Sequence, residues 1–554
     1  MTKRGRHARR RSSIVVALAL VVLPSPAYGR AGDLDQSFGR LGRVTTDVTS
    51  GSPTLSAIGS QPDGKLLAVG YFVGNTNGNV LVRYNADGSL DPGFGMGGRL
   101  FETGEERSPG DVALQPDGRF ITAEESFSDG YDLVRREADG TIDATFGVEG
   151  RVTTSFPGGS VGAGRLTRQE DGGLVVSGGF SAPLPAGAGR GSVARSLVAL
   201  ARYRADGSLD ARFGGDGRVT TSLGPGSTGA ADHVVQPDGK IVVAAGYSGR
   251  FGRPRSITLL RYEVDGSLDR SFGVEGRARV VRGTNRVRAL ALAPDGGLVV
   301  AGTKTRETSF VARRLPDGAP DQSFGREGLA VARFGSSAKF LAGVSAMALA
   351  PSGQVLLTGL VLDRADRADF GLARFTARGA LDRSFGQAGL VITAFGGSGV
   401  DELPSDLSLD PGGKVVVAGF RSSPTSPPED FILARYHTQP FSNLGPLARE
   451  RTIEDFIDQG VRVPLGCSQS CRARIELTVN RSYARQHGLP TVVGRTSLGL
   501  TQPGQSSTVV RLIPKARRAF RTEQPGTLRL EVRFDAEGRT RELSRRLLDV
   551  APVK

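Results

Sequence analysis

The segment "NADGSLDPGFG", residues 85–95, contains the pattern N-x-D-G-x-x-D, whose side-chain oxygens could hold a calcium ion. Calcium is bound by several hard oxygen ligands, so Asn85, Asp87 and Asp91 are the candidate metal ligands. Asp and Gly at this spacing also make Asx-type and positive-φ turns, which need no metal. A metal loop would have to keep its ligand types wherever the segment recurs.

The segment does recur, and its recurrence favours the turn. In each complete copy, 11 residues separate an Arg from the Phe of an "FG" pair, as from Arg83 to Phe94, so the connection has one fixed geometry. Arg and Leu cannot replace a hard oxygen ligand. We therefore predict a turn here, and the sequence indicates neither a metal nor a cofactor. In the other copies the position of Asn85 is taken by Glu137, Arg204, Glu263, Leu315 and Thr376.

The two cysteines of the chain, Cys467 and Cys471, lie close together in "CSQSC". Two thiols make a poor zinc site, because zinc takes four ligands and the nearest histidine, His487, stands alone. The C-x-x-x-C spacing also differs from that of thioredoxin-like redox pairs. In an exported protein this pair predicts a disulfide that closes a tight loop.

Catalytic motifs are missing from the sequence. Beyond the leader the histidines are His233, His437 and His487, widely separated and without a metal-ligand neighbour. The chain contains no G-x-S-x-G, P-loop or H-E-x-x-H pattern. We name no catalytic residue and expect a non-enzyme. A hydrolase or lyase site assembled from carboxylates distant in sequence stays open as the alternative, with His233 as one partner.

Three phrases organise the chain, each occurring seven times in the same order with a repeat of roughly 52 to 67 residues. The repeats alternate apolar strand segments with turn residues, as in "KIVVAAG" (240–246), "ITLLRY" (257–262) and "GRVTT" (217–221). Four short antiparallel strands per repeat and seven repeats predict an all-β, seven-bladed β-propeller. A solenoid of stacked sheets is the competing architecture. The phrases begin with "LDQSFG" (34), "QPDGK" (61) and "LVRY" (81).

The repeat resembles the delta-60 repeats of bacterial secreted β-propellers and, more distantly, NHL-type blades. The resemblance covers residues 33–438 and implies a fold without implying a catalytic residue. By analogy with NHL blades, the strand before "PDG" is innermost and "GRVTT" is outermost. The first such strand, residues 42–46, should therefore complete the seventh blade beside "FILARY" (431–436), so that the ring has no exposed edge.

The recurrent side chains are those of a scaffold. The Arg of each "RY" phrase and the Asp of each "LD" should pair or cap turns locally, because sevenfold repetition suits a scaffold better than a single site. The Phe of each "FG" should be buried between neighbouring blades, worth on the order of 2 to 3 kcal/mol each. These residues are Phe38, Phe94, Phe146, Phe213, Phe272, Phe324 and Phe385.

Recognition should occur where the repeats differ. The variable spans contain loops that open on one face of a propeller, while the invariant turns occupy the opposite face. The largest protrusion should be "GGFSAPLPAGAGRGSVARS", residues 178–196. We predict that this variable face binds a protein or a polysaccharide, neither of which the sequence identifies.

The first residues predict export. Residues 1–29 combine an Arg-rich start with the apolar run "IVVALALVVL" (14–23), which is typical of a signal peptide. That run is too short to span a bilayer, so we expect no membrane span and a secreted protein that is extracellular or cell-wall associated. A twin-arginine route is the alternative, although Ser12 and Ser13 stand where it prefers apolar residues.

A second domain follows the propeller of residues 30–438. Residues 439–449 are predicted to be a linker, and 450–554 a small immunoglobulin-like β-sandwich that resembles the C-terminal all-β modules of actinobacterial exported proteins. Residues 514–520 could form a helical turn. The predicted strands are 462–465, 471–479, 507–513, 527–534 and 540–550.

The net charge of +15 comes from the two ends of the chain. Residues 446–554 hold 20 Lys and Arg against 11 Asp and Glu, the signal peptide adds six cations, and residues 30–445 are neutral. A neutral propeller without Trp argues against nucleic-acid binding. The basic domain could contact an anionic cell wall or could be a solvated strand face, and we expect a monomer.

Overall fold

The computed structural model describes residues 31–439 and 461–549, apart from short gaps. The chain divides into two compact units, a propeller of Arg30–Phe441 and a unit that contains Ser442–Lys554. The predicted signal peptide lies outside the described residues and stays a prediction. The gaps are 49–50, 75, 105–106, 127–129, 184–194, 225, 249–254, 285, 306, 333–339, 363–367, 397–399, 423–429, 468–470, 480, 501–503, 523–526 and 537–538.

The first unit is a seven-bladed β-propeller, as predicted. Each blade is a four-stranded antiparallel sheet, and we number blades 1 to 7 by their innermost strands along the chain. The innermost strands are β2 (Ser52–Ser60), β6 (Arg107–Leu114), β10 (Ser160–Arg168), β14 (Ser227–Val235), β18 (Val287–Leu292), β22 (Phe340–Leu349) and β26 (Asp401–Leu409).

The second strand of most blades begins with an apolar run, because both of its faces are covered by neighbouring blades, whereas β7 of blade 2 contains the polar residues Thr122, Glu124 and Glu125. In β15, for example, the side chains from Ile241 to Ala245 are all buried. The second strands are β3 (Leu66–Val73), β7 (Phe120–Ser126), β11 (Leu174–Ala182), β15 (Ile241–Ser248), β19 (Leu298–Thr305), β23 (Val355–Leu362) and β27 (Val415–Ser422).

The two outer positions of each blade hold the "RY" strand and the "GRVTT" strand. The third strands are β4 (Gly78–Tyr84), β8 (Tyr131–Arg136), β12 (Arg195–Tyr203), β16 (Ser256–Tyr262), β20 (Thr308–Arg314), β24 (Ala368–Phe375) and β28 (Asp430–Tyr436). The outermost strands are β1 (Arg43–Asp47), β5 (Arg99–Thr103), β9 (Arg151–Thr154), β13 (Arg218–Thr221), β17 (Arg277–Arg282), β21 (Leu329–Ala332) and β25 (Leu390–Thr393).

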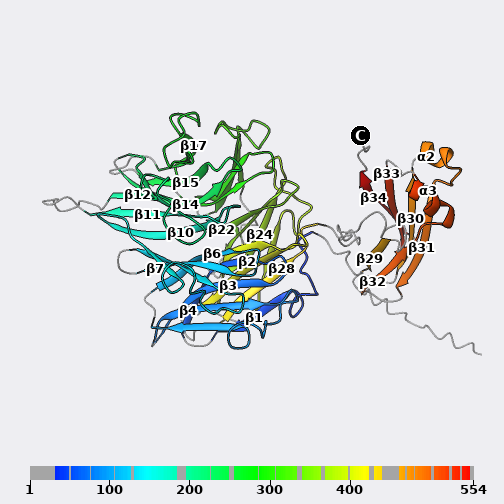
Figure 1. The fold of residues 1–554 in the computed structure, drawn as a ribbon, viewed down its shortest axis with the longest axis horizontal. Coiled ribbons are helices and arrows are strands. Elements are labelled where there is room, and N and C mark those ends of the chain that lie inside the picture. Colours follow the sequence, from blue (N-terminus) through cyan, green and yellow to red (C-terminus); the bar gives the residue numbers. More distant parts are fainter. Residues whose placement is uncertain are drawn as a thin grey trace, which may run out of the picture. The chain divides into compact units, whose positions relative to one another are not determined.

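Strand β1 closes the ring. It pairs antiparallel with β28, from Arg43 opposite Ala434 to Asp47 opposite Asp430, so blade 7 has the order β1, β28, β27, β26. Figure 1 shows the blue first strands beside the yellow last strands of the propeller. The predicted closure is confirmed, and no outermost position of a blade is left unpaired.

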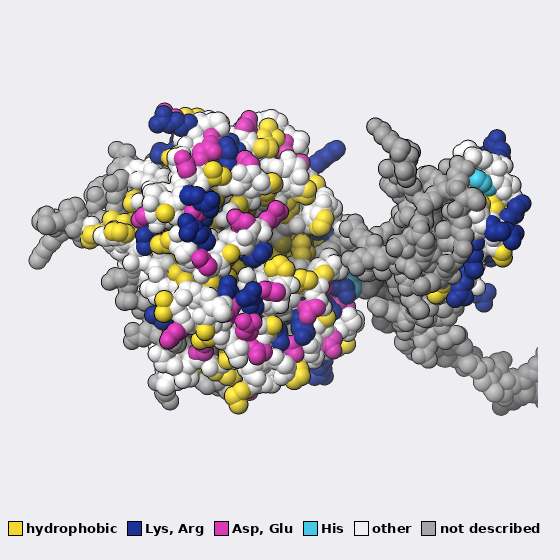
Figure 2. All heavy atoms as spheres, in the orientation of Figure 1, with side chains coloured by type: hydrophobic (Ala, Val, Ile, Leu, Met, Phe, Trp, Pro, Cys, Tyr) yellow, Lys and Arg dark blue, Asp and Glu magenta, His cyan; other side chains and the backbone are white. Residues whose placement is uncertain are grey.

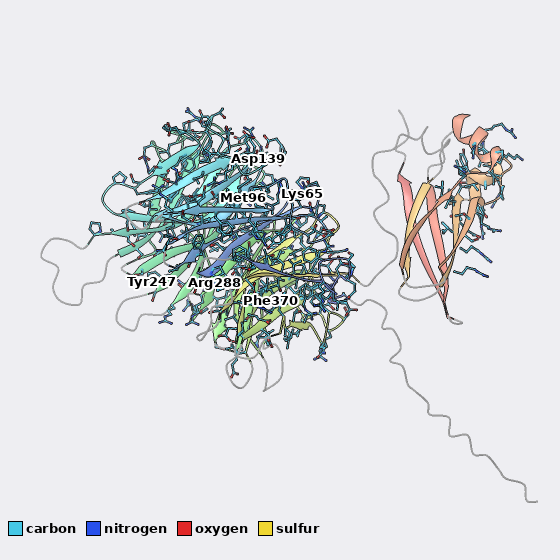
Figure 3. The ribbon with its side chains drawn as sticks, turned by 90° about the horizontal axis from the view of Figure 1, so that it is seen from below. Lys65, Met96, Asp139, Tyr247, Arg288 and Phe370 are labelled. Carbon is cyan, nitrogen blue, oxygen red and sulfur yellow. The ribbon has the colours of Figure 1, made fainter. Side chains whose placement is uncertain are left out.

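The antiparallel order places the loops at two ends of the propeller. The "PDG" turns and the "RY" to "FG" connections lie at one end, which we call the turn end. The connections from second to third strands and between blades lie at the other, which we call the variable end. Figure 3 shows Lys65, Met96 and Asp139 at the turn end and Tyr247 toward the variable end.

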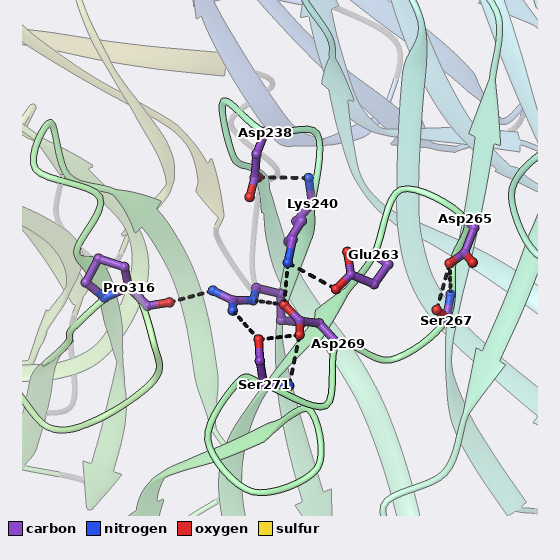
Figure 4. A network of polar contacts seen from close by, with 9 residues as sticks. Asp238, Lys240, Glu263, Asp265, Ser267, Asp269, Ser271 and Pro316 are labelled. Carbon is purple, nitrogen blue, oxygen red and sulfur yellow. Dashed lines mark hydrogen bonds and ion pairs between the residues drawn. The ribbon is translucent and has the colours of Figure 1, made fainter.

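At the turn end of six blades, one arginine holds three groups at once, whereas Arg313 of blade 5 pairs with Asp295 and Asp321. In blade 4, Arg261 Nε donates to Asp269 Oδ2 at 2.7 Å, and Nη1 donates to the carbonyl of Pro316 in blade 5 at 2.6 Å (Figure 4). The same guanidinium lies 4.6 Å from the ring centre of Phe272, within cation–π range. One side chain thus fixes its own turn, the buried ring and the next blade.

The arrangement recurs around the ring, which confirms the predicted scaffold role of these residues. The seven phenylalanines of the "FG" pairs are at most 1% exposed. The Arg–Asp pairs are Arg83–Asp91, Arg135–Asp143, Arg202–Asp210, Arg261–Asp269, Arg313–Asp321, Arg374–Asp382 and Arg435–Asp35.

A second contact joins the outer strands of adjacent blades. In four blades the buried tyrosine that ends the third strand bonds to the threonine of the preceding blade, as from Tyr262 Oη to Thr221 Oγ1 at 2.8 Å. Burial raises the pKa of Tyr262 above its ordinary value, so the phenol stays a donor. In blade 2 the tyrosine is replaced by Arg136, which pairs instead with Glu102 of blade 1 at 2.8 Å.

The second unit contains two antiparallel sheets and two short helices. Strand β29 (Val461–Cys467) pairs with β32 (Gly504–Val510). The larger sheet has the order β31 (Val492–Leu500), β30 (Cys471–Val479), β33 (Thr527–Ala536), β34 (Arg539–Asp549). The helices are α2 (Arg481–Gln486) and α3 (Pro514–Thr522).

Five of the strands in this unit and α3 were expected from the sequence, whereas β31 and α2 were not. The sequence of β31, "VVGRTSLGL", contains two glycines that weaken its strand pattern. Helix α2 has six residues, fewer than two full turns. The predicted strand 507–513 is displaced, since β32 ends at Val510. An immunoglobulin-like topology stays a prediction.

Arg435→Met should open the ring at its seam. The substitution leaves the buried carboxylate of Asp35 with Lys414 as its remaining cation, and we expect a loss of about 3 kcal/mol in the free energy of unfolding. Urea denaturation measures the loss. The control is Asp216→Asn at the exposed pair Arg218–Asp216, which should cost less than about 1 kcal/mol. Equal losses in the two variants would contradict the assignment.

Candidate functional site

A cleft opens at the variable end of blade 3. Its volume is about 550 Å³. The walls come from the start of β10 and the end of β11, with one residue each from β7 of blade 2 and β14 of blade 4. The lining residues are Glu125, Ser160, Val161, Gly162, Ala163, Gly164, Gly178, Gly179, Ser181 and Ala230.

Paired glycines create the cleft. In blade 3 the first two strands place Gly162 opposite Gly179, and in blade 4 they place Gly229 opposite Gly246. The space above Gly179 and Gly229 is open, whereas the carboxylate of Glu125 lies over Gly162. A Cβ added to Gly179 would meet no atom within 4 Å. In the other blades the second strand carries Tyr71, Glu125, Thr303, Leu360 and Phe420 at this position.

Glu125 supplies the carboxylate of the cleft. It occupies in blade 2 the position that Gly179 occupies in blade 3, and its carboxylate lies against Gly162, where a Cβ would collide with Oε1. The cleft walls partly enclose Glu125, and this burial raises the pKa of its carboxyl above the ordinary value. Together with Ser160 and Ser181, it offers hydrogen-bonding groups to a polar ligand.

A cluster of charged side chains from several innermost strands lines the central channel below the variable end. Each innermost strand contains a β-bulge, and the residue after the bulge is Asp111 in blade 2, Arg165 in blade 3 and Asp232 in blade 4. Arg165 Nη1 lies 3.6 Å from Asp111 Oδ1, and Arg165 Nε lies 3.3 Å from Asp232 Oδ1. Asp406 of blade 7 contributes a third carboxylate, and the three together raise the pKa of Arg165.

These aspartates join neighbouring blades. Asp111 Oδ2 accepts from the amide of Leu166 at 2.8 Å, and Asp232 Oδ2 accepts from Leu290 at 2.7 Å. Asp406 Oδ2 accepts from the amide of Ile58 in blade 1 at 3.0 Å. Burial raises the pKa of Asp232 and of Asp406, while Arg165 acts against this rise. The carboxylates therefore serve the scaffold, each holding the next innermost strand.

His233 follows Asp232 in the chain, but its side chain does not face the charged cluster around Arg165. Its Nδ1 contacts Ser177 Oγ at 2.9 Å between blades 3 and 4. Burial lowers the pKa of His233 to about 3, so the ring is neutral at physiological pH. The enzyme alternative named a carboxylate paired with His233 as one possible arrangement, and here the side-chain partner of His233 is Ser177.

The residues of the calcium-like pattern make turns. Asp87 Oδ1 accepts from the amide and hydroxyl of Ser89 at 2.9 and 2.6 Å. Asp91 is engaged by Arg83 at 2.7 Å and by Lys65 at 3.0 Å. The amide nitrogen of Asn85 donates to Ser89 and Leu90. Both cations engage Asp91 Oδ2, and Asp91 Oδ1 accepts from the amide of Gly93.

Two further predictions fall partly outside the described residues. The side chains of Cys467 and Cys471 lie outside them, so the disulfide stays a prediction. The expected loop of residues 178–196 is shorter than predicted, because β11 extends to Ala182 and β12 begins at Arg195. Residues 184–194 are not described.

A second cavity, of about 480 Å³, lies at the turn end of blades 3 and 4. It surrounds the ion pair of Arg202 and Asp210, which has a counterpart in every blade. The ion pair at its centre repeats around the ring, so it does not distinguish blade 3 from the other blades.

Sequence reasoning missed the cleft residues. The glycine pairs become visible only when repeats are aligned through the bulge, since the bulge shifts the pairing by one residue. The doublet Gly178–Gly179 was instead assigned to a loop. An alignment of the seven second strands at this position would have shown glycine where other blades carry bulky side chains.

Comparisons with known proteins agree with the propeller repeat. A family described as "Domain of unknown function (DUF5122) beta-propeller" matches residues 61–94, 236–272, 293–324 and 350–385, which lie in blades 1, 4, 5 and 6. The chain is therefore built from repeats similar to those of a propeller family. No curated protein matches the sequence.

Solved structures with a similar fold are distant in sequence. The polysaccharide lyase Uly1 is 12% identical with a TM-score of 0.42, covering 76% of this chain and 94% of its own. A puromycin hydrolase is 15% identical with a TM-score of 0.39, covering 80% and 62%. The PQQ-bound aldose sugar dehydrogenase from Streptomyces coelicolor is 16% identical with a TM-score of 0.34, covering 59% and 93%.

Among the described residues, no helix is long and apolar enough to cross a membrane.

Glu402 is a buried carboxylate near the variable end of blade 7. Both of its oxygens accept from the amide of Phe395, at 2.8 and 2.9 Å. Burial raises its pKa from the ordinary 4.5 to about 7. The carboxylate anchors the segment that enters blade 7.

The raised pKa of Glu402 predicts a pH dependence of stability. The folded protein binds this proton more tightly than the unfolded chain, so this residue's contribution to the free energy of unfolding falls as the pH rises from about 4.5 to 7. Glu402→Gln keeps an acceptor for Phe395 and should flatten this part of the profile. Urea denaturation across the pH range, with exposed Glu170→Gln as control, measures the slope. An unchanged slope in Glu402→Gln would show that another group titrates.

Proposed function

We propose that this chain is a secreted, non-catalytic recognition protein whose propeller binds a segment of a polysaccharide at the variable end. The observation that carries the proposal is the glycine-lined cleft of blade 3, where the variable end departs from the repeat. Loops and strand ends that differ between repeats are where a rigid scaffold presents a binding surface.

The size and polarity of the cleft suit a hydroxyl-rich ligand. Its volume of about 550 Å³ is in the range of ligand-binding pockets. Glycines bring the backbone to the surface, so a ligand can approach peptide groups closely. Glu125, Ser160 and Ser181 add acceptors and donors for hydroxyl groups. Sugar rings present such groups at every unit, whereas an apolar peptide side chain would find few partners here.

A hydrolase or lyase is the second candidate. The three channel aspartates gathered near Arg165 are the observation that favours it. Their oxygens are used by backbone amides of neighbouring blades, which is why we favour binding without turnover. Turnover of the bound polysaccharide, lost in Glu125→Gln while binding persists, would support the enzyme instead.

Filling the cleft should abolish binding without unfolding the propeller. Gly179 has room for a side chain and a negative φ, so Gly179→Leu should fold normally and occupy the cleft. We expect the affinity for the polysaccharide to fall by at least about tenfold, or 1.4 kcal/mol. Calorimetric titration with fragments of dextran, xylan and galactan, chosen after an array of neutral and acidic glycans, measures the loss.

Gly343→Leu is the matched control. Gly343 lies on the innermost strand of blade 6 opposite Leu360, at the position that Gly162 holds in blade 3, and a Cβ there meets only Thr303 Oγ1 at 4.0 Å. Binding should survive this change. Loss of binding in both variants, or in neither, would exclude the cleft as the site. Binding to a peptide array with no binding to glycans would replace the proposed ligand class by a protein.

A further inference from the structure

The charge of the second unit is one-sided. Among the side chains that the structure describes from residue 472 to residue 519, nine are Lys or Arg and one, Glu476, is acidic. Figure 2 shows dark blue side chains along the described surface of this unit, whereas blue and magenta are intermixed on the propeller. The positive charge is therefore concentrated on a small part of the molecule.

Helices α2 and α3 present four of these charges together. Arg481 and Arg485 are four residues apart on α2, and Lys515 and Arg518 are three apart on α3, so each pair shares a helix face. Lys515 Nζ donates to the carbonyl of Gly488 at 2.8 Å, just beyond the end of α2, and this bond ties the helices together. We call these four exposed side chains the two-helix basic surface.

The opposite faces of the two helices are anchored in the unit. Tyr483 and Ala484 of α2 and Ala516 of α3 are buried, as are Leu489 and Leu512 beside them. The helices are held by their apolar sides, which directs the charged sides to solvent. The surface is thus a fixed feature of the fold.

The charges of this surface have no acidic partner among the described residues. Glu476, the acidic side chain described here, pairs with Arg495 at 2.8 Å on the neighbouring sheet. Four cations on two adjacent short helices repel one another unless anions approach from outside. An anionic partner with several closely spaced charges would pair with several of these cations at once and so relieve their repulsion.

We infer that the two-helix basic surface binds a linear polyanion whose charges are closely spaced phosphate groups, without bases or lipid tails. The described part of this unit exposes no large apolar side chain. Tyr483, its described aromatic residue other than histidine, is buried. Among the described side chains of this unit, none is placed to stack on a base or to insert into a lipid surface, and the exposed groups available for binding are the charged ones. The inference is independent of the ligand proposed for the propeller.

The test uses the full chain with fluorescein-labelled inorganic polyphosphate as probe. Fluorescence anisotropy should show binding that weakens with salt, with a slope of about −3 in log K against log salt for four phosphate contacts. Arg481→Gln, Arg485→Gln, Lys515→Gln and Arg518→Gln combined should weaken binding at least about tenfold and bring the slope close to zero.

The matched control removes four exposed arginines from the turn end of the propeller. Arg204→Gln, Arg270→Gln, Arg326→Gln and Arg383→Gln combined lower the net charge equally and should leave polyphosphate binding unchanged. Equal weakening in both variants would reduce the effect to net charge and overturn the inference. Tighter binding of single-stranded DNA, or of vesicles with anionic lipid, than of polyphosphate at equal charge would also overturn it.

Discussion

The guanidinium that joins an aspartate, a phenylalanine ring and the next blade is the interaction on which this propeller depends. A blade alone is a small twisted sheet with two apolar faces, and it becomes stable only when neighbours cover both. Arg261 shows how the covering is fixed at the turn end, since its charge is held by Asp269 and its remaining donors reach Pro316 of blade 5. Breaking such a buried pair leaves a charge without its partner, which costs several kcal/mol. The use of this contact in six of the seven blades keeps the spacing between blades uniform.

The residues of this contact also explain why the fold was predictable. Arg, Asp and Phe recur at fixed separation because the turn tolerates no other geometry, and seven copies give the number of blades. The closure by β1 followed from where the first "GRVTT" and the last "FILARY" stand in the chain. Strand β31 and helix α2 were missed because a glycine-containing strand and a six-residue helix leave little periodicity to detect.

The candidate site could not be predicted in the same way. The cleft is present because Gly162 and Gly179 have no side chains. These two glycines face each other only because the bulge shifts the pairing register by one residue. Glu125 stands in another repeat, and its approach to Gly162 depends on how blade 2 packs against blade 3. The repeats show which residues all the blades share. The departures that matter for recognition are single residues whose neighbours are set by tertiary structure.

Closure by β1 also has a consequence for how the protein folds. Asp35 and Arg435 meet although 400 residues separate them, so the seam cannot form until nearly the whole propeller has been synthesised. Every earlier blade can pack on its predecessor as it emerges, but the first blade waits with one face uncovered. Contacts this distant in sequence slow folding and lengthen the time during which an incomplete ring could recruit a strand from another molecule. A chaperone acting on this protein would therefore be needed chiefly at the two termini of the propeller.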